Sequence, residues 1–172
     1  MENTPYWALS IIYWLHMLAT VVWIGGLAAL SLFVLPAARQ ALDPAPYAAF
    51  LAAMQRRLDP LGWFCLALLA VTGMFQMSAS PYYQGFLAID NTWAAAILVK
   101  HILFVGMAVI SAYLTWGLLP ALRRLALRRA KAPESASGED MQRLQQRETQ
   151  LLRLNLILGV LVLLLTAFAR AA

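Results

Sequence analysis

Four runs of about 20 or more predominantly apolar residues set the strongest limit on how this chain can fold. A run of that length lets an α-helix cross the hydrocarbon core of a bilayer, which is about 30 Å thick. Lipid offers the backbone no hydrogen-bond partner, so a spanning segment must satisfy its own backbone groups. The sequence therefore predicts an all-α integral membrane protein, a single four-transmembrane-helix bundle in one domain over residues 1–172, with spans at about 6–35, 60–79, 92–119 and 151–169.

Composition supports a membrane protein and excludes several other classes. Hydrophobic residues make up 62% of the chain and charged residues only 12%, against about 25% charged in a typical soluble domain. The net charge of +5 comes without basic residues interleaved with aromatic ones, so no nucleic-acid partner is expected. Cys65 is the only cysteine, which excludes an intrachain disulfide and a cysteine-cluster metal site.

The basic residues are distributed unevenly among the connections. The 80–91 connection contains no Lys or Arg, whereas the connections after the first and third spans are rich in arginine. Basic connections of membrane proteins stay in the cytoplasm. We therefore expect a multi-pass membrane protein with both termini extracytoplasmic and with cytoplasmic Arg39, Arg56, Arg57, Arg123, Arg124, Arg128, Arg129, Lys131, Arg143 and Arg147.

Two further features are expected on the cytoplasmic side. Residues 46–58 place several apolar side chains on one helical face, which predicts a short amphipathic helix lying at the membrane surface. Residues 132–138 are rich in Ser, Pro and Gly and predict a flexible cytoplasmic linker. Pro36 and Pro120 follow apolar runs, so they are expected to end the first and third helices.

His16 and His101 are ionisable residues in runs that otherwise suit lipid, where an ionisable group costs about 2.5–3.5 kcal/mol or more. They follow Trp7 and Trp93 by nine and eight residues, on two helices that are expected to run in the same direction. At 1.5 Å per residue, both lie about 12–14 Å below the outer interface. Two imidazoles at one depth can ligate a metal from two sides, as in a bis-histidine b haem. Lys100 is expected either to pair with a haem propionate or to extend its amine to the headgroups.

Other interpretations of these residues stay open. Each histidine can instead hydrogen-bond a neighbouring helix or a backbone carbonyl and bind nothing. Copper is a second candidate metal because Cu(I) favours Met, Cys and His, but the methionines form no tight cluster. No carboxylate lies deep in a predicted span, which disfavours carboxylate-based proton transport, and no Ser/His/Asp set, phosphate loop or HExxH motif supports a hydrolase or kinase.

The segments "WLHMLATVVWIGGLAALSLFVLPA", "RRLDPLGWFCLALLAVTG" and "LVKHILFVGMAVISAYLTWGLLPAL" resemble the copper-resistance protein D (CopD) family of membrane proteins. The similarity covers about residues 8–125 and lies in the order of His16, Trp23, Gly25, Gly26, Pro36, Arg57, Pro60, Thr72, Gly73, Lys100 and Pro120. The resemblance implies a location in a bacterial cytoplasmic (inner) membrane and copper uptake or export across it, together with a periplasmic copper-binding partner.

A more distant similarity links the chain to HemJ-type membrane protoporphyrinogen oxidases, which are associated with haem. It places His16 and Lys100 at the family's histidine and lysine positions, but Tyr113 is followed by Leu114 where those enzymes carry a further histidine. The leading prediction is a copper-handling membrane protein with His16 and His101 as metal ligands and Lys100 beside the cofactor. The alternatives are a b-haem redox subunit with a redox partner, a HemJ-like oxidase and a structural subunit of a membrane complex. No catalytic residue is assigned.

Overall fold

The computed structural model describes residues 5–83, 85, 91–131 and 138–171, and they form a bundle of long helices. No strand occurs among these residues, so the predicted all-α class is confirmed for them. The elements follow one another as α1 (Tyr6–Ala29), η1 (Leu30–Val34), α2 (Leu35–Ala41), α3 (Pro44–Ser78), α4 (Thr92–Ala112), η2 (Tyr113–Leu118), α5 (Leu119–Lys131) and α6 (Gly138–Ala171).

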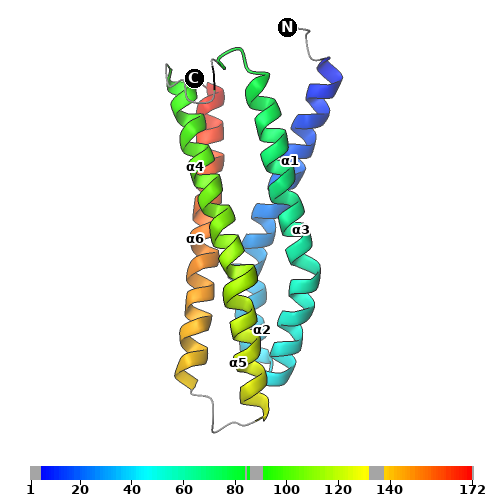
Figure 1. The fold of residues 1–172 in the computed structure, drawn as a ribbon, viewed down its shortest axis with the longest axis vertical. Helices are drawn as coiled ribbons and strands as arrows, with labels where there is room; N and C mark the ends of the chain where they lie inside the picture. Colours follow the sequence, from blue (N-terminus) through cyan, green and yellow to red (C-terminus); the bar gives the residue numbers. More distant parts are fainter. Residues whose placement is uncertain (1–4, 84, 86–90, 132–137, 172) are drawn as a thin grey trace.

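These elements build four continuous helical columns, in which η1 joins α1 to α2 and η2 joins α4 to α5 (Figure 1). In the described part of the chain, all four columns are long and apolar enough to cross a membrane. The beginning of α1 and the end of α6 lie at one end of the bundle, called here the terminal end. The α2–α3 connection and the neighbouring ends of α5 and α6 lie at the opposite end, called the basic end (Figure 1).

The prolines predicted to end the first and third helices do not end them. Each follows a π-helical segment, η1 or η2, after which an α-helix continues to Ala41 or Lys131. At these segments the Leu35 N–H donates to the Leu30 carbonyl and the Leu119 N–H to the Leu114 carbonyl, five residues back. A proline ring clashes with the carbonyl four residues earlier and lacks an N–H donor. The wider π turn before Pro36 and Pro120 relieves that clash and lets both helices continue.

The separate surface helix predicted for residues 46–58 is also corrected by the structure. These residues are the first part of α3, which runs unbroken through Pro60 to Ser78. Tyr47, Ala48 and Leu51 are buried in the bundle core, and α3 packs against α5. The apolar face that suggested a surface helix therefore packs against protein. Of the predicted 132–138 linker, only Gly138 lies among the described residues, and it is the first residue of α6.

The principal core cluster includes residues from α1, α2, α3, η2, α5 and α6, such as Leu51, Leu122 and Leu152. Trp63 of α3 stacks on Trp116 of η2 with ring centroids 4.9 Å apart. Elsewhere large apolar side chains point outward, among them Trp14, Phe64 and Ile102, each more than 60% exposed. A surface of this kind on all four columns fits a bilayer rather than water.

Candidate metal or cofactor site

His16, on α1, contacts α3 through one ring nitrogen. Its Nδ1 lies 2.7 Å from the Thr72 hydroxyl, and that hydroxyl donates its hydrogen to the Leu68 carbonyl at 2.5 Å. Since the single hydroxyl hydrogen is already used, Nδ1 of His16 is the donor in their bond. The Nε2 atom of the neutral ring then carries a free lone pair. Thr72 is buried, which fixes the orientation of the half-buried imidazole.

His101, on α4, is oriented in the same way by its own helix. Its Nδ1 lies 2.7 Å from the carbonyl oxygen of Ile97, one turn earlier. A carbonyl can only accept, so Nδ1 is again the donor and Nε2 has the lone pair. Metal-binding histidines commonly donate their second ring N–H to a carbonyl or another protein group, which fixes the tautomer and the ring. The donor atoms of both histidines therefore suit a metal or a haem iron.

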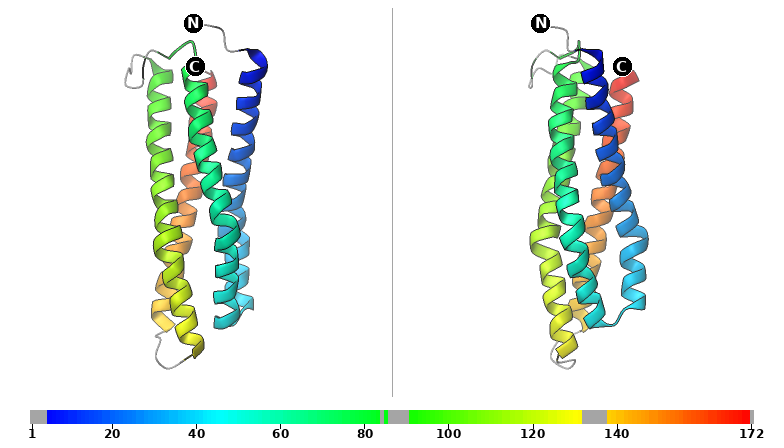
Figure 2. Two further views of the ribbon diagram at one scale, coloured as in Figure 1. Left: turned by 45° about the vertical axis from the view of Figure 1, so that its right-hand side comes forward. Right: turned by 90° about the vertical axis from the view of Figure 1, so that its right-hand side faces the viewer.

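The two histidine-bearing helices lie diagonally across the bundle. Figure 2 shows α1 and α4 on opposite sides with α3 and α6 between them, and both α1 and α4 pack against α6. The hydrogen bonds above tie His16 to α3 and His101 to its own helix. A single ligand shared by both rings stays a prediction. Within the described ranges, no group of three or more His, Cys, Asp or Glu side chains is placed to hold a metal ion.

Lys100 is the predicted site residue that the structure brings close to His16. This half-buried lysine on α4 acts electrostatically on the His16 ring. An ammonium group at this place opposes a second cation at His16 and favours a ligand that carries negative charge. The local charge thus bears on which ligand the histidines hold.

Replacing Thr72 by valine is expected to weaken ligand binding at His16 without unfolding the bundle. Valine keeps the shape of the side chain but removes the acceptor that orients the imidazole, and loss of such a partner typically costs 10–100-fold in metal affinity. The measurement is the affinity of the purified protein for Cu(I) or haem. Thr166→Val is the matched control, since the Thr166 hydroxyl bonds only to the Val162 carbonyl of its own helix. Equal affinities in the two variants would show that Thr72 does not support a ligand site.

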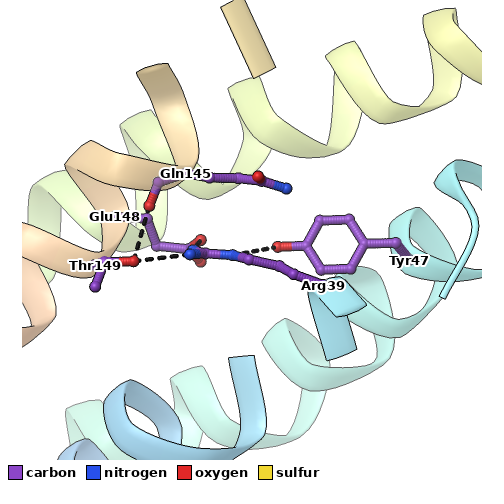
Figure 3. A network of polar contacts seen from close by, with 5 residues as sticks. All are labelled: Arg39, Tyr47, Gln145, Glu148 and Thr149. Carbon is purple, nitrogen blue, oxygen red and sulfur yellow. Dashed lines mark hydrogen bonds and ion pairs between the residues drawn. The ribbon is translucent and has the colours of Figure 1, made fainter. Parts of the chain in front are cut away.

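Sequence analysis missed a second polar cluster, at the basic end, which joins α2, α3 and α6 (Figure 3). Arg39 forms an ion pair with Glu148, donates to the Thr149 hydroxyl at 2.8 Å and reaches the Tyr47 hydroxyl at 3.5 Å. Glu148 is fully buried, and the Arg39 side chain is 17% exposed. The cluster fixes the ends of three helices against one another.

The signal that could have revealed this cluster is a stripe along α6. Met141, Gln145, Glu148, Leu152 and Asn155 alternate by four and three residues, so they share one helical face. Of these, Met141, Glu148, Leu152 and Asn155 are buried. Asn155 donates to the Ser111 hydroxyl of α4 at 2.9 Å. The composition of this run is polar, but its spacing indicates a helix packed in a bundle.

The architecture and its apolar surface define a multi-pass, all-α membrane protein. A sequence model of the family described as "Copper resistance protein D" matches residues 52–169, which covers most of α3 and all of α4 and α5. The chain therefore belongs to the copper resistance protein D family. The matched region contains Lys100 and His101 but begins after His16. Comparison with curated proteins and with solved structures gives no match, so the similarity to HemJ-type oxidases has no support there.

Proposed function

We propose that this protein handles copper in the membrane through a site that contains His16 and His101, with copper as its cargo. Membership in the copper resistance protein D family supports copper as the metal. The observation that supports the site is that both imidazoles hold Nδ1 on a protein acceptor, which fixes the orientation of each ring. Imidazole nitrogen is a suitable ligand for copper.

Copper binding can be tested directly on the purified full-length protein. Cu(I) is titrated against a competing chelator of known affinity, with wild-type protein and the His101→Ala variant compared in the same lipid. We expect at least a tenfold weaker affinity in the variant, since one of two ligands is lost. Met107→Leu is the control, because Met107 is a buried core residue of the same helix and carries a potential sulfur ligand. A normal affinity in His101→Ala would contradict the proposed site.

A b haem is the second candidate ligand, and the position of Lys100 specifically favours it. The ammonium group acts on His16 from α4, and a haem propionate would neutralise this positive charge. His16 and His101 are the residues that would hold such a haem, since two imidazoles are the ligands of a bis-histidine haem iron. The positive charge of Lys100 therefore opposes binding of copper and favours binding of haem.

Replacing Lys100 by methionine is expected to change binding of the two ligands in opposite directions. Removing the ammonium group ends its repulsion of copper, so the affinity for Cu(I) rises several-fold. The same change removes the partner of a propionate, so haem retention falls. The measurements are Cu(I) affinity and Soret absorbance per protein in the wild type and the variant. An unchanged value of both would rule out an electrostatic role of Lys100 at the site.

We also propose that the basic end faces the cytoplasm of a bacterial cell and that α1 begins and α6 ends outside the cytoplasmic membrane. Support comes from the last turn of α5, which contains Arg128, Arg129 and Lys131, because basic flanks remain cytoplasmic. A reporter that is active only in the periplasm should be active when fused after Ala172 and inactive when inserted at residues 132–138. The reverse pair of results would overturn this orientation. A copper-binding or redox protein on the periplasmic side is the expected partner.

A further inference from the structure

A pocket of about 100 Å³ lies among the four helical columns, between the histidines and the basic end. Each helical element from α1 to α6 contributes at least one lining residue, and so do both π segments. The residues from the π segments are Leu30, Leu114 and Thr115. Most of the lining is apolar. Three of the lining residues, Trp23, Glu148 and Asn155, carry buried polar side-chain atoms.

Each of these three residues has a polar atom without a hydrogen-bond partner among the described residues, namely Trp23 Nε1, Glu148 Oε1 and Asn155 Oδ1. Glu148 and Asn155 are both fully buried. Buried polar atoms in proteins are almost always hydrogen-bonded, and ordered water supplies the partner where protein does not. Since three such atoms border one pocket, the pocket itself is the place where their partners bind.

The neighbouring contacts fix which atoms lack a partner among the described residues. The Ser111 hydroxyl donates to the Met107 carbonyl at 2.8 Å, so it can only accept from Asn155, whose Nδ2 lies 2.9 Å away. The amide oxygen of Asn155 is therefore the unpartnered atom. The Oε2 atom of Glu148 is held by Arg39, which leaves Oε1 unpartnered. A guest must donate to two oxygens and accept from one indole N–H.

Water has both the donors and the acceptors that this arrangement requires. Glu148 and Asn155 are seven residues apart, which is about 10 Å along the helix axis, so one molecule cannot reach both. A pocket of about 100 Å³ has room for several waters, since each needs roughly 10–15 Å³. We propose that this pocket holds a file of water molecules anchored by Trp23, Glu148 and Asn155, and that Glu148 binds and releases a proton through this water.

The proton step involves few other groups. A hydrated proton in the pocket transfers to Oε1 of Glu148, forming the O–H bond of a neutral carboxylic acid and leaving water; release is the reverse. The charged or titratable groups that face Glu148 or line the pocket are Arg39 from α2, with Tyr47 and Asp59 from α3. From η2 and α5 the pocket is lined by Leu114, Thr115 and Leu119, which carry no charge. When Glu148 is neutral, Arg39 keeps its bonds to Thr149 and Tyr47.

Infrared spectroscopy of the full chain in lipid nanodiscs tests this proposal without altering Glu148. The chain has four glutamates, so the triple variant Glu2→Gln, Glu134→Gln and Glu139→Gln leaves Glu148 as the only one. Labelling that variant with ¹³C-glutamate gives any carboxyl band of Glu148 an isotope shift that aspartates lack. The pH is lowered in steps while circular dichroism verifies that the bundle stays folded.

We expect a protonated-carboxyl band with the ¹³C shift to grow as the pH falls, and to shift again within seconds of transfer to D₂O. Two results would overturn the proposal. A Glu148 that stays ionised at every pH at which the protein is folded excludes proton binding. A protonated band that does not respond to D₂O in the folded protein excludes the water file. Neither result depends on copper or on the histidines.

Discussion

Replacing Glu148 by alanine is expected to lower the free energy of unfolding by about 3–5 kcal/mol, since the change leaves a buried positive charge without its partner. Glu148 is fully buried and is the only carboxylate paired with Arg39, whose side chain is 17% exposed, among the described residues. Arg39 would keep only its bonds to Thr149 and Tyr47. The measurement is unfolding by denaturant in mixed micelles, followed by circular dichroism.

An exposed ion pair of the same helix provides the control. Glu139 and Arg143 are 3.5 Å apart, with side chains 80% and 72% exposed, and exposed pairs contribute little because water screens them. Glu139→Ala should therefore change stability by about 0.5 kcal/mol or less. The double change Arg39→Met and Glu148→Met should cost less than Glu148→Ala, because it removes both charges together. A loss in Glu148→Ala no larger than in Glu139→Ala would contradict this account of the cluster.

Removing either His16 or His101 is expected to abolish most of the bound ligand, and removing both should add little. A ligand held from two sides depends on both rings, so its loss is non-additive. The experiment compares wild type, His16→Ala, His101→Ala and the double variant, each expressed with copper and haem available. Bound copper is measured by elemental analysis and bound haem by the Soret band.

Two independent structural histidines would give a different pattern. His16→Ala would then lose its bond to Thr72, and His101→Ala its bond to Ile97. Each loss would appear in stability alone, and the two losses would add. Additive stability effects with unchanged ligand content in the single variants would show that the histidines do not share a ligand.

The number of spanning helices could be predicted from sequence because a bilayer requires long apolar runs, and the four runs are conspicuous. The positions at which the helices end could not be predicted in the same way. Pro36 and Pro120 are strong stop signals in water-soluble helices, but here a preceding π turn accommodates each of them. The surface helix predicted for residues 46–58 was wrong, because this segment is part of α3 and its apolar face packs in the bundle. Hydropathy alone could not tell a lipid surface from the neighbouring α5 as the partner of that face.

Of the candidate site, the positions of the histidines along their helices could be predicted from the sequence, whereas their contacts could not. The depth of His16 and His101 follows from helix geometry, so sequence alone could place them in the half of the bundle nearer the terminal end. Their hydrogen-bond partners depend on tertiary packing, as the contact between His16 and Thr72 joins residues 56 positions apart. The sequence neighbours of Glu148 are polar, so composition alone does not indicate that it is buried. The burial of Glu148 depends on its pairing with Arg39, 109 residues away, and no local sequence pattern reveals that contact.

The most direct test of the central claim is the ligand content of the wild-type protein compared with the His16→Ala, His101→Ala double variant. Both are purified from membranes of cells grown with copper, and copper and haem are measured per protein on the same samples. The account predicts close to one copper per wild-type chain, with no Soret band, and almost none in the double variant. Equal copper content in the two proteins, or none in either, would contradict it.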